Sequence, residues 1–229
     1  MIRTVLLDLD DTILDFHKAE AIALAETLRT LDIDPTPERL TLYSAINAEQ
    51  WRRLEAGEIT RAEVLTTRFD ILFRELGVTR SSDQAQAAYE ARLSRGHYFI
   101  DGAVEMLESL SRRYSLYLVS NGNLRVQEGR LESAGISRFF KGIFISELVG
   151  ADKPSPLFFE RCFAQIPDFA RETTMIVGDS LTSDIRGGIN AGIRTCWFNP
   201  AHKQPAYGVM PDCEIHSLAE LEPLIRSIP

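Results

Sequence analysis

The sequence predicts an α/β protein: a doubly wound parallel sheet with a helical cap inserted after its first strand. Short apolar runs alternate with amphipathic helical patterns in the second half of the chain, an order typical of parallel sheets covered by helices. A further apolar run at residues 5–9 is followed by helical patterns without a convincing strand. We therefore expect a discontinuous core, residues 1–14 and 99–229, and a helical cap domain, residues 15–98.

The first predicted strand ends in a cluster of polar side chains. The apolar residues of this strand are Val5, Leu6, Leu7 and Leu9, and the run is too short to span a membrane. Asp8, Asp10 and Thr12 lie at its carboxyl end, which is the end where ligands bind in open α/β sheets. Two acids at this spacing indicate a reaction centre, but an acidic turn explains D-x-D-x-T on its own equally well.

Four helices are predicted in the inserted segment. They are expected at residues 17–33, 36–57, 60–77 and 82–95. Apolar residues recur there at helical spacing. Thr60 and Glu63 form a capping box at the start of the third helix, and Ser82 is expected to cap the fourth.

From Asp101 onward the chain is expected to complete the sheet. Strands are predicted at residues 115–121, 141–146, 173–180 and 194–199, with a short one near Glu214. The amphipathic segments between these runs are expected to form helices on both faces of the sheet.

Composition excludes several classes of protein. The 229 residues allow an ample core without disulfides or a structural metal. A formal charge of −8 opposes binding to a nucleic acid polymer, whose phosphates require clustered Lys and Arg. Three cysteines without C-x-x-C spacing indicate neither a disulfide framework nor a zinc site. The sequence shows no secretory leader pattern and no membrane span, so we expect a cytoplasmic protein.

Polar groups follow three later strands in the order that phosphoryl transfer requires. Ser120 and Asn121 end one strand, Lys153 follows the next, and Asp179 with Asp184 follows a third. A parallel sheet places these ends side by side. The set then offers acids for nucleophilic attack and proton transfer, groups that hold phosphate oxygens, and acids for a hard cation. Each motif alone could be a turn or a helix start, but their order after separate strands favours a catalytic site.

These motifs resemble those of the haloacid dehalogenase-like hydrolases. DLDDT, SNG, ADKP and GDSLTSD match the four motifs of that family, and the inserted helices are similar to its first cap class. The resemblance implies that Asp8 attacks phosphorus and becomes an aspartyl phosphate. It also implies that Asp10 protonates the leaving alcohol and later activates water, and that Thr12 orients these acids. Ser120 and the backbone at Asn121 would hold phosphate oxygens.

The resemblance implies a magnesium site as well. Mg²⁺ would be bound by the Asp8 carboxylate, the Asp10 carbonyl and Asp179, with water and phosphate completing its octahedron. Lys153 would hold a phosphate oxygen and offset charge between nucleophile and substrate. Asp184 would orient Lys153 or a metal-bound water.

Three segments further resemble the bacterial pyrimidine 5′-nucleotidases: residues 46–69, 120–136 and 187–202. They imply that the substrate is a nucleoside monophosphate such as UMP, dUMP or dTMP. Phosphoglycolate or a sugar phosphate is the alternative substrate, and a phosphoglucomutase-like enzyme would share the same core residues. A metal-free 2-haloacid dehalogenase is disfavoured by Asp10 and Asp179. A receiver-like phospho-switch is disfavoured by the chain length, the insertion and Asp10.

The sequence does not define which residues of the cap contact the substrate. Phe16, His17, Trp51 and Tyr98 lie where a cap could meet a base, although core packing explains the aromatic residues equally well. The expected partner is a small-molecule phosphate ester. A monomer and a homodimer both stay open.

Overall fold

A six-stranded parallel sheet forms the centre of the molecule, which is described by a computed structural model for residues 1–206 and 208–228. Its strands are β1 (Thr4–Leu7), β2 (Ser115–Ser120), β3 (Gly142–Ile145), β4 (Thr174–Gly178), β5 (Arg194–Phe198) and β6 (Cys213–Ile215). The spatial order is β3-β2-β1-β4-β5-β6. The first strand therefore lies inside the sheet, with Leu7 opposite Leu118 on one side and Val177 on the other. The predicted fold class is confirmed.

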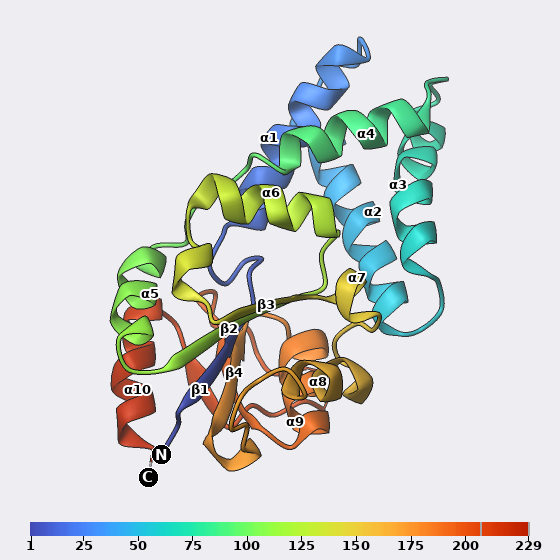
Figure 1. The fold of residues 1–229 in the computed structure, drawn as a ribbon. Coiled ribbons are helices and arrows are strands. Elements are labelled where there is room, and N and C mark those ends of the chain that lie inside the picture. Colours follow the sequence, from blue (N-terminus) through green and yellow to red (C-terminus); the bar gives the residue numbers. More distant parts are fainter. Residues whose placement is uncertain (207, 229) are drawn as a thin grey trace.

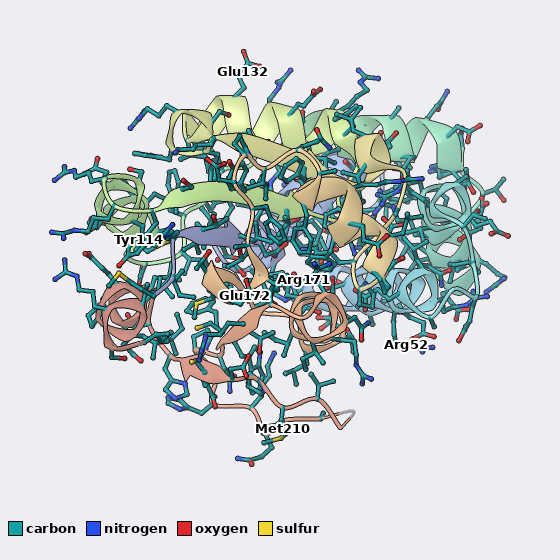
Figure 2. All side chains as sticks on the ribbon, turned by 60° about the horizontal axis from the view of Figure 1, so that its bottom comes forward. Arg52, Tyr114, Glu132, Arg171, Glu172 and Met210 are labelled. Carbon is teal, nitrogen blue, oxygen red and sulfur yellow. The ribbon has the colours of Figure 1, made fainter. Side chains whose placement is uncertain are left out.

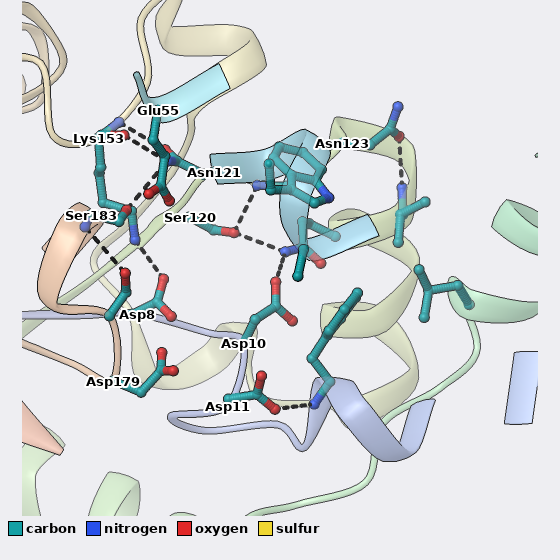
Figure 3. Close-up of a pocket in the computed structure, with 18 of the residues that line it drawn as sticks. Asp8, Asp10, Asp11, Glu55, Ser120, Asn121, Asn123, Lys153, Asp179 and Ser183 are labelled. Carbon is teal, nitrogen blue, oxygen red and sulfur yellow. Dashed lines mark hydrogen bonds and ion pairs between the residues drawn. The ribbon is translucent and has the colours of Figure 1, made fainter. Parts of the chain in front are cut away.

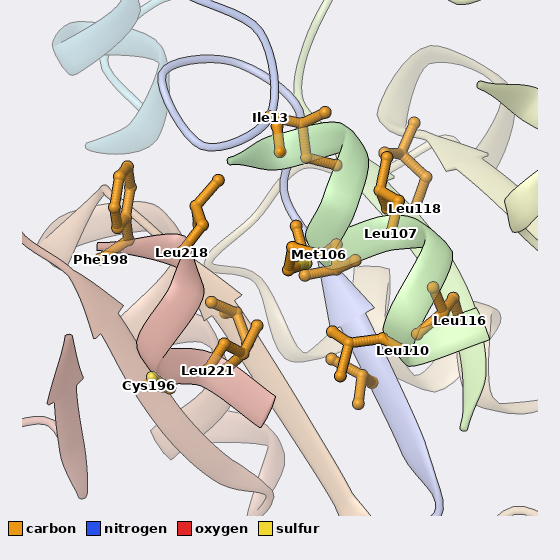
Figure 4. Close-up of a cluster of buried hydrophobic side chains, with 14 of the residues drawn as sticks. Ile13, Met106, Leu107, Leu110, Leu116, Leu118, Cys196, Phe198, Leu218 and Leu221 are labelled. Carbon is orange, nitrogen blue, oxygen red and sulfur yellow. The ribbon is translucent and has the colours of Figure 1, made fainter. Parts of the chain in front are cut away.

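Helices cover both faces of the sheet. They are α5 (Ala103–Ser111) and α10 (Leu221–Ser227) on one face, and α8 (Pro156–Phe163) and α9 (Arg186–Ala191) on the other (Figure 1). Val5 and Leu7 pack with α5 and α10 in one apolar cluster (Figure 4), whereas Leu6 packs with α8 in another. This alternation along β1 is the period-two pattern of a strand that is buried on both sides.

The inserted segment forms its own helical layer above the carboxyl ends of the strands (Figure 1). Its helices are α1 (Phe16–Thr30), α2 (Pro37–Glu55), α3 (Arg61–Glu75) and α4 (Ser82–Leu93). Tyr43, Phe69 and Tyr89 are fully buried between them, with ring centroids 5.0 to 5.7 Å apart. Because these aromatic residues make a separate apolar core, the insert packs as a unit. The division into domains at residues 14 and 99 stays a prediction.

The two ends of the insert lie side by side. Leu14 and Phe99 form an isolated antiparallel bridge. Beside it, the Asp15 amide donates to the Tyr98 carbonyl at 2.7 Å. The chain thus enters and leaves the insert at one place on the sheet.

The remaining elements are shorter. They are α6 (Leu124–Ala134), α7 (Ser146–Val149), a π-helical turn (Leu181–Ile185), and 3₁₀ turns at Ser137–Phe139, Arg171–Thr173 and Leu218–Glu220. α6 lies between the sheet and the insert (Figure 1), and its Val126 packs into the core of the insert. Polar side chains such as Glu132 on α6 and Arg52 on α2 project outward (Figure 2).

Two local predictions were wrong. The first helix ends at Thr30, not residue 33, because Asp32 takes a left-handed backbone with φ of 56°. The fourth helix is capped by Ser81, whose hydroxyl accepts from the Gln84 amide at 3.3 Å, and Ser82 is its first helical residue. Among the described residues, no helix is long and apolar enough to cross a bilayer.

Candidate active site

The carboxyl ends of the strands face the insert across a cavity of about 350 Å³ (Figure 3). Seven of the eight residues predicted from the sequence line this cavity: Asp8, Asp10, Ser120, Asn121, Lys153, Asp179 and Asp184. Thr12 is fully buried, and its Oγ1 accepts from the Asp179 amide at 3.1 Å. It therefore joins the loop after β1 to the loop after β4.

Lys153 is the central cation of the site. Its side chain is 2% exposed, and Nζ donates to Asp8 Oδ1 at 2.5 Å, to Asp184 Oδ1 at 2.7 Å and to the Val119 carbonyl at 2.9 Å. Burial alone would lower the pKa of Lys153, but the carboxylates of Asp184 and Asp8 outweigh it and raise that pKa. Lys153 is therefore a fixed ammonium group beside the Asp8 carboxylate.

Asn121 holds the loop that carries Lys153. Its side-chain amide donates to the Lys153 carbonyl, and its side-chain oxygen accepts from the Lys153 amide, both at 2.8 Å. From the sequence, only the backbone of Asn121 was expected to act, on phosphate. The side chain instead clamps the neighbouring loop.

Three carboxylates gather around the same point. One oxygen each of Asp8, Asp179 and Asp184 lies within 4.8 Å of the others. Burial, followed by the charges of neighbouring carboxylates, raises the pKa of both Asp8 and Asp179. Such an all-oxygen donor set suits a hard divalent cation such as Mg²⁺, whose charge would relieve this repulsion.

Asp184 reaches this cluster because of a close approach to β4. A Cβ on Gly178 would lie 2.2 Å from Asp184 Oδ2. The same oxygen accepts from the Ser180 amide at 3.1 Å, while Oδ1 binds Lys153. Both Asp184 oxygens are thus engaged in orienting other parts of the site.

Asp10 is held by two buried side chains of α6 that the sequence analysis missed. Gln127 Nε2 donates to Asp10 Oδ2 at 2.6 Å and to Ser120 Oγ at 2.8 Å. Arg130 forms an ion pair with Asp10 Oδ1 and donates through Nε to the Gly96 carbonyl at 2.9 Å. The available signal was the pair of polar residues at i and i+3 on one face of the helix that follows SNG.

The insert adds its own side chains to the site. Glu55, near the end of α2, accepts from the Thr182 hydroxyl at 2.8 Å, and burial raises its pKa. Arg61, at the start of α3, donates to the carbonyls of Asn121 at 2.8 Å and Gly122 at 3.0 Å. The end of α2 and the start of α3 therefore each contact the core.

Arg61 also forms an ion pair with Asp152 and a hydrogen bond with Ser146. Its guanidinium lies 5.6 Å from the Trp51 ring centroid. One arginine thus joins a helix of the insert to two loops of the sheet.

The remaining wall of the cavity comes from the insert and α6. It includes Phe16, His17, Ala48, Trp51, Leu65, Arg68, Glu90, Leu93 and Val126. Phe16, His17 and Trp51 thus lie where the sequence indicated. Tyr98 is not among the lining residues of the described cavity and has the Lys18 ammonium 4.9 Å from its ring centroid.

A family model for haloacid dehalogenase-like hydrolases matches residues 2–192. The chain belongs to this family of hydrolases. The motif residues quoted from the sequence lie within the matched span, and in the structure they surround one cavity.

Several relatives match almost the full chain. YfnB of Bacillus subtilis is 43% identical over 219 residues, which cover 96% of this chain and 93% of YfnB. The pyrimidine 5′-nucleotidase PynA of Streptococcus pneumoniae is 37% identical over 220 residues, covering 96% and 93%. The pyrimidine 5′-nucleotidase YjjG of Escherichia coli is 30% identical over 221 residues, covering 96% of both chains.

A solved structure shares the whole architecture. The crystal structure of YfnB bound to magnesium, which reveals interdomain movement, superposes with a TM-score of 0.93 at 42% identity and covers 98% of both chains. The relation to this haloacid dehalogenase-like hydrolase therefore includes the insert as well as the sheet.

Proposed function

We propose that the protein is a Mg²⁺-dependent phosphomonoester hydrolase that acts on pyrimidine nucleoside 5′-monophosphates through an aspartyl phosphate. The observation that carries this proposal is the contact between the buried Lys153 ammonium and Asp8, beside Asp179. A carboxylate nucleophile meets an anionic phosphate there only if fixed positive charge offsets their repulsion. Two full-length relatives that are pyrimidine 5′-nucleotidases support the substrate class.

Asp8 is the proposed nucleophile. Its carboxylate oxygen attacks phosphorus as the bond from phosphorus to the leaving oxygen breaks. Lys153 and the Ser120 hydroxyl face the transferred group and stabilise its oxygens. Mg²⁺, held by Asp8, the Asp10 carbonyl and Asp179, would supply further positive charge at the phosphoryl group.

Asp10 is the proposed proton-transfer group. It gives a proton to the leaving alkoxide, which departs as the nucleoside. A water molecule then takes the vacated place, Asp10 removes its proton, and the resulting hydroxide attacks phosphorus to release phosphate and free Asp8. Gln127 and Arg130 hold the Asp10 carboxylate at the edge of the cavity between these steps.

The test is a panel of phosphate esters with purified protein and Mg²⁺. UMP, dUMP and dTMP are expected to be hydrolysed faster than phosphoglycolate and sugar phosphates, and chelation by EDTA is expected to abolish turnover. Turnover of a 2-haloacid that survives EDTA would support dehalogenase-type chemistry, and phosphoryl transfer between sugar phosphates would support a mutase. A long-lived phosphoprotein would support a phospho-switch.

The matched variants are Asp8→Asn and Asp168→Asn. Asp8→Asn is expected to eliminate turnover and the trapping of labelled phosphate on the protein, while the fold stays intact. Asp168 lies exposed in the loop before β4, at the opposite end of the strand from the site. Its replacement is expected to leave activity unchanged. Equal activity of the Asp8→Asn and wild-type proteins would refute the mechanism.

A further inference from the structure

Arg68 on α3 places a buried positive charge in the cap wall of the cavity. The residue is 3% exposed and lines the cavity. Its Nε donates to Gln86 Oε1 at 3.0 Å, and its Nη1 donates to Asn47 Oδ1 at 2.9 Å. Its guanidinium also lies 5.0 Å from the centroid of the Tyr89 ring. These protein partners are all uncharged.

The positive charge of Arg68 lacks a direct counter-ion. Within the described part of the chain, no carboxylate lies within 4.0 Å of the guanidinium, and Nη2 donates to no residue. Burying a guanidinium is costly unless hydrogen-bonding partners compensate for the lost water. Arg68 Nη2 is not among the buried side-chain atoms of the described residues that lack a partner, so it is open to the cavity, where it can donate to a ligand.

Glu90 on α4 places an acceptor beside this donor. It lines the same cavity, and its Oε1 accepts from Gln86 Nε2 at 2.6 Å. Gln86 thus bridges the two charged side chains: it accepts from Arg68 and donates to Glu90. Arg68 and Glu90 are fixed on neighbouring helices as a donor and an acceptor.

The wall around this pair is apolar. Trp51, Leu65 and Leu93 line the cavity from α2, α3 and α4. Apolar and aromatic walls with few fixed polar groups are typical of sites for small, largely flat molecules. The part of the substrate that extends from the phosphate toward the cap would meet this wall.

We propose that Arg68 and Glu90 recognise the imide edge of uracil or thymine in the leaving nucleoside. Arg68 donates to a ring carbonyl, and Glu90 accepts the adjacent N3–H. The inference rests on the proposed nucleotidase function and specifies its substrate. Cytosine carries a lone pair at N3 that would face the Glu90 carboxylate, and the carboxylate of phosphoglycolate would meet the same negative charge.

The experiment compares kcat/KM for UMP, CMP and ribose 5-phosphate in the wild-type protein and in variants. Arg68→Met is expected to lower the value for UMP at least about tenfold more than the value for ribose 5-phosphate, since the latter has no base. Glu90→Gln is expected to raise the CMP to UMP ratio at least about tenfold, because the glutamine amide can donate to N3 of cytosine. Glu132→Gln, at an exposed position on α6, is the matched control and is expected to keep the wild-type ratios.

Two outcomes separate this inference from the proposed function. If the wild-type protein hydrolyses UMP no better than ribose 5-phosphate, the nucleotidase function itself fails. If the wild-type protein prefers UMP but both variants keep its substrate ratios, only the roles of Arg68 and Glu90 are overturned. Thermal unfolding of each variant checks the fold. Should Arg68→Met not fold, the CMP to UMP ratio of Glu90→Gln decides, because Glu90 is only half-buried.

Discussion

At the scale of single residues, the site holds more negative than positive charge. Asp8, Asp179 and Asp184 lie close together, and Lys153 is the cation that contacts two of them. Burial and, after it, the charges of neighbouring carboxylates raise the pKa of Asp8 and of Asp179. Without a bound cation, this cluster therefore opposes folding, and functional sites commonly carry such a cost.

Replacing Asp179 is expected to stabilise the metal-free protein. Asp179→Asn removes one of the crowded negative charges and should raise the free energy of unfolding in EDTA by about 1 kcal/mol. In the wild-type protein, Mg²⁺ at a hundred times its Kd should add about 2.7 kcal/mol, and this gain should vanish in the variant. Urea unfolding with and without Mg²⁺ measures both effects, with Asp168→Asn as the control. Equal Mg²⁺ stabilisation in both proteins would contradict the metal site.

Gln127 gives a second prediction at this scale. Gln127→Leu removes the hydrogen bond to Asp10 Oδ2 while keeping a side chain of similar size. Proton transfer to the leaving group should then suffer, so kcat for UMP should fall about tenfold more than kcat for p-nitrophenyl phosphate, whose leaving group needs little protonation. A merely structural role for Gln127 would lower both rates by the same factor.

At the scale of elements, the start of α3 carries a polar contact between the insert and the loops of the sheet. Arg61 is the first residue of α3 and lies within the Thr60 and Glu63 capping box that the sequence predicted. The cap of the helix fixes where its first side chain points. Helix capping thereby positions a residue that reaches across to the catalytic loops.

Arg61→Ala is expected to weaken the contact between the insert and the sheet. Loss of its contacts to the Asn121 and Gly122 carbonyls should lower kcat/KM for UMP about tenfold, mainly through KM, because the insert would position the substrate less precisely over the catalytic loops. Steady-state kinetics measures the change. Arg74→Ala removes an exposed arginine from the far end of the same helix and should have no effect. Equal losses in the two variants would count against the role of Arg61.

A second prediction at the scale of elements concerns Gly178, the last residue of β4. In Gly178→Ala, the new methyl group at the end of β4 would collide with the carboxylate of Asp184. We expect a loss of about 1 to 3 kcal/mol in unfolding free energy and weaker stabilisation by Mg²⁺. Thermal unfolding with a Mg²⁺ titration tests both. A variant with wild-type response to Mg²⁺ would show that Asp184 can move without consequence.

The sequence was sufficient to predict the site residues that follow the strands, but not the site residues on the faces of the helices. Asp8, Lys153 and Asp179 could be placed together because apolar runs locate parallel strands, whose carboxyl ends share one edge. Gln127 and Arg68 were not predicted, because the role of a buried polar residue on a helix depends on which element packs against it. Helix periodicity identifies a buried face but not the partner that it meets.

At the scale of the whole molecule, the order of the strands explains the position of the site. β1 lies inside the sheet, with β2 and β4 as neighbours, so the side chains that follow these three strands converge. The insert lies over these strand ends and supplies the opposite wall of the cavity (Figure 1). The sheet thus carries the reacting groups, and the insert carries the groups assigned to the leaving nucleoside.

Because the Leu14–Phe99 bridge brings both ends of the insert together, everything between them can be exchanged without altering any strand neighbour. Recombination at two points in a gene could therefore place a different insert over the same catalytic residues of the sheet. Chimaeras joined at these two residues should retain the catalytic chemistry while adopting the substrate range of the donor.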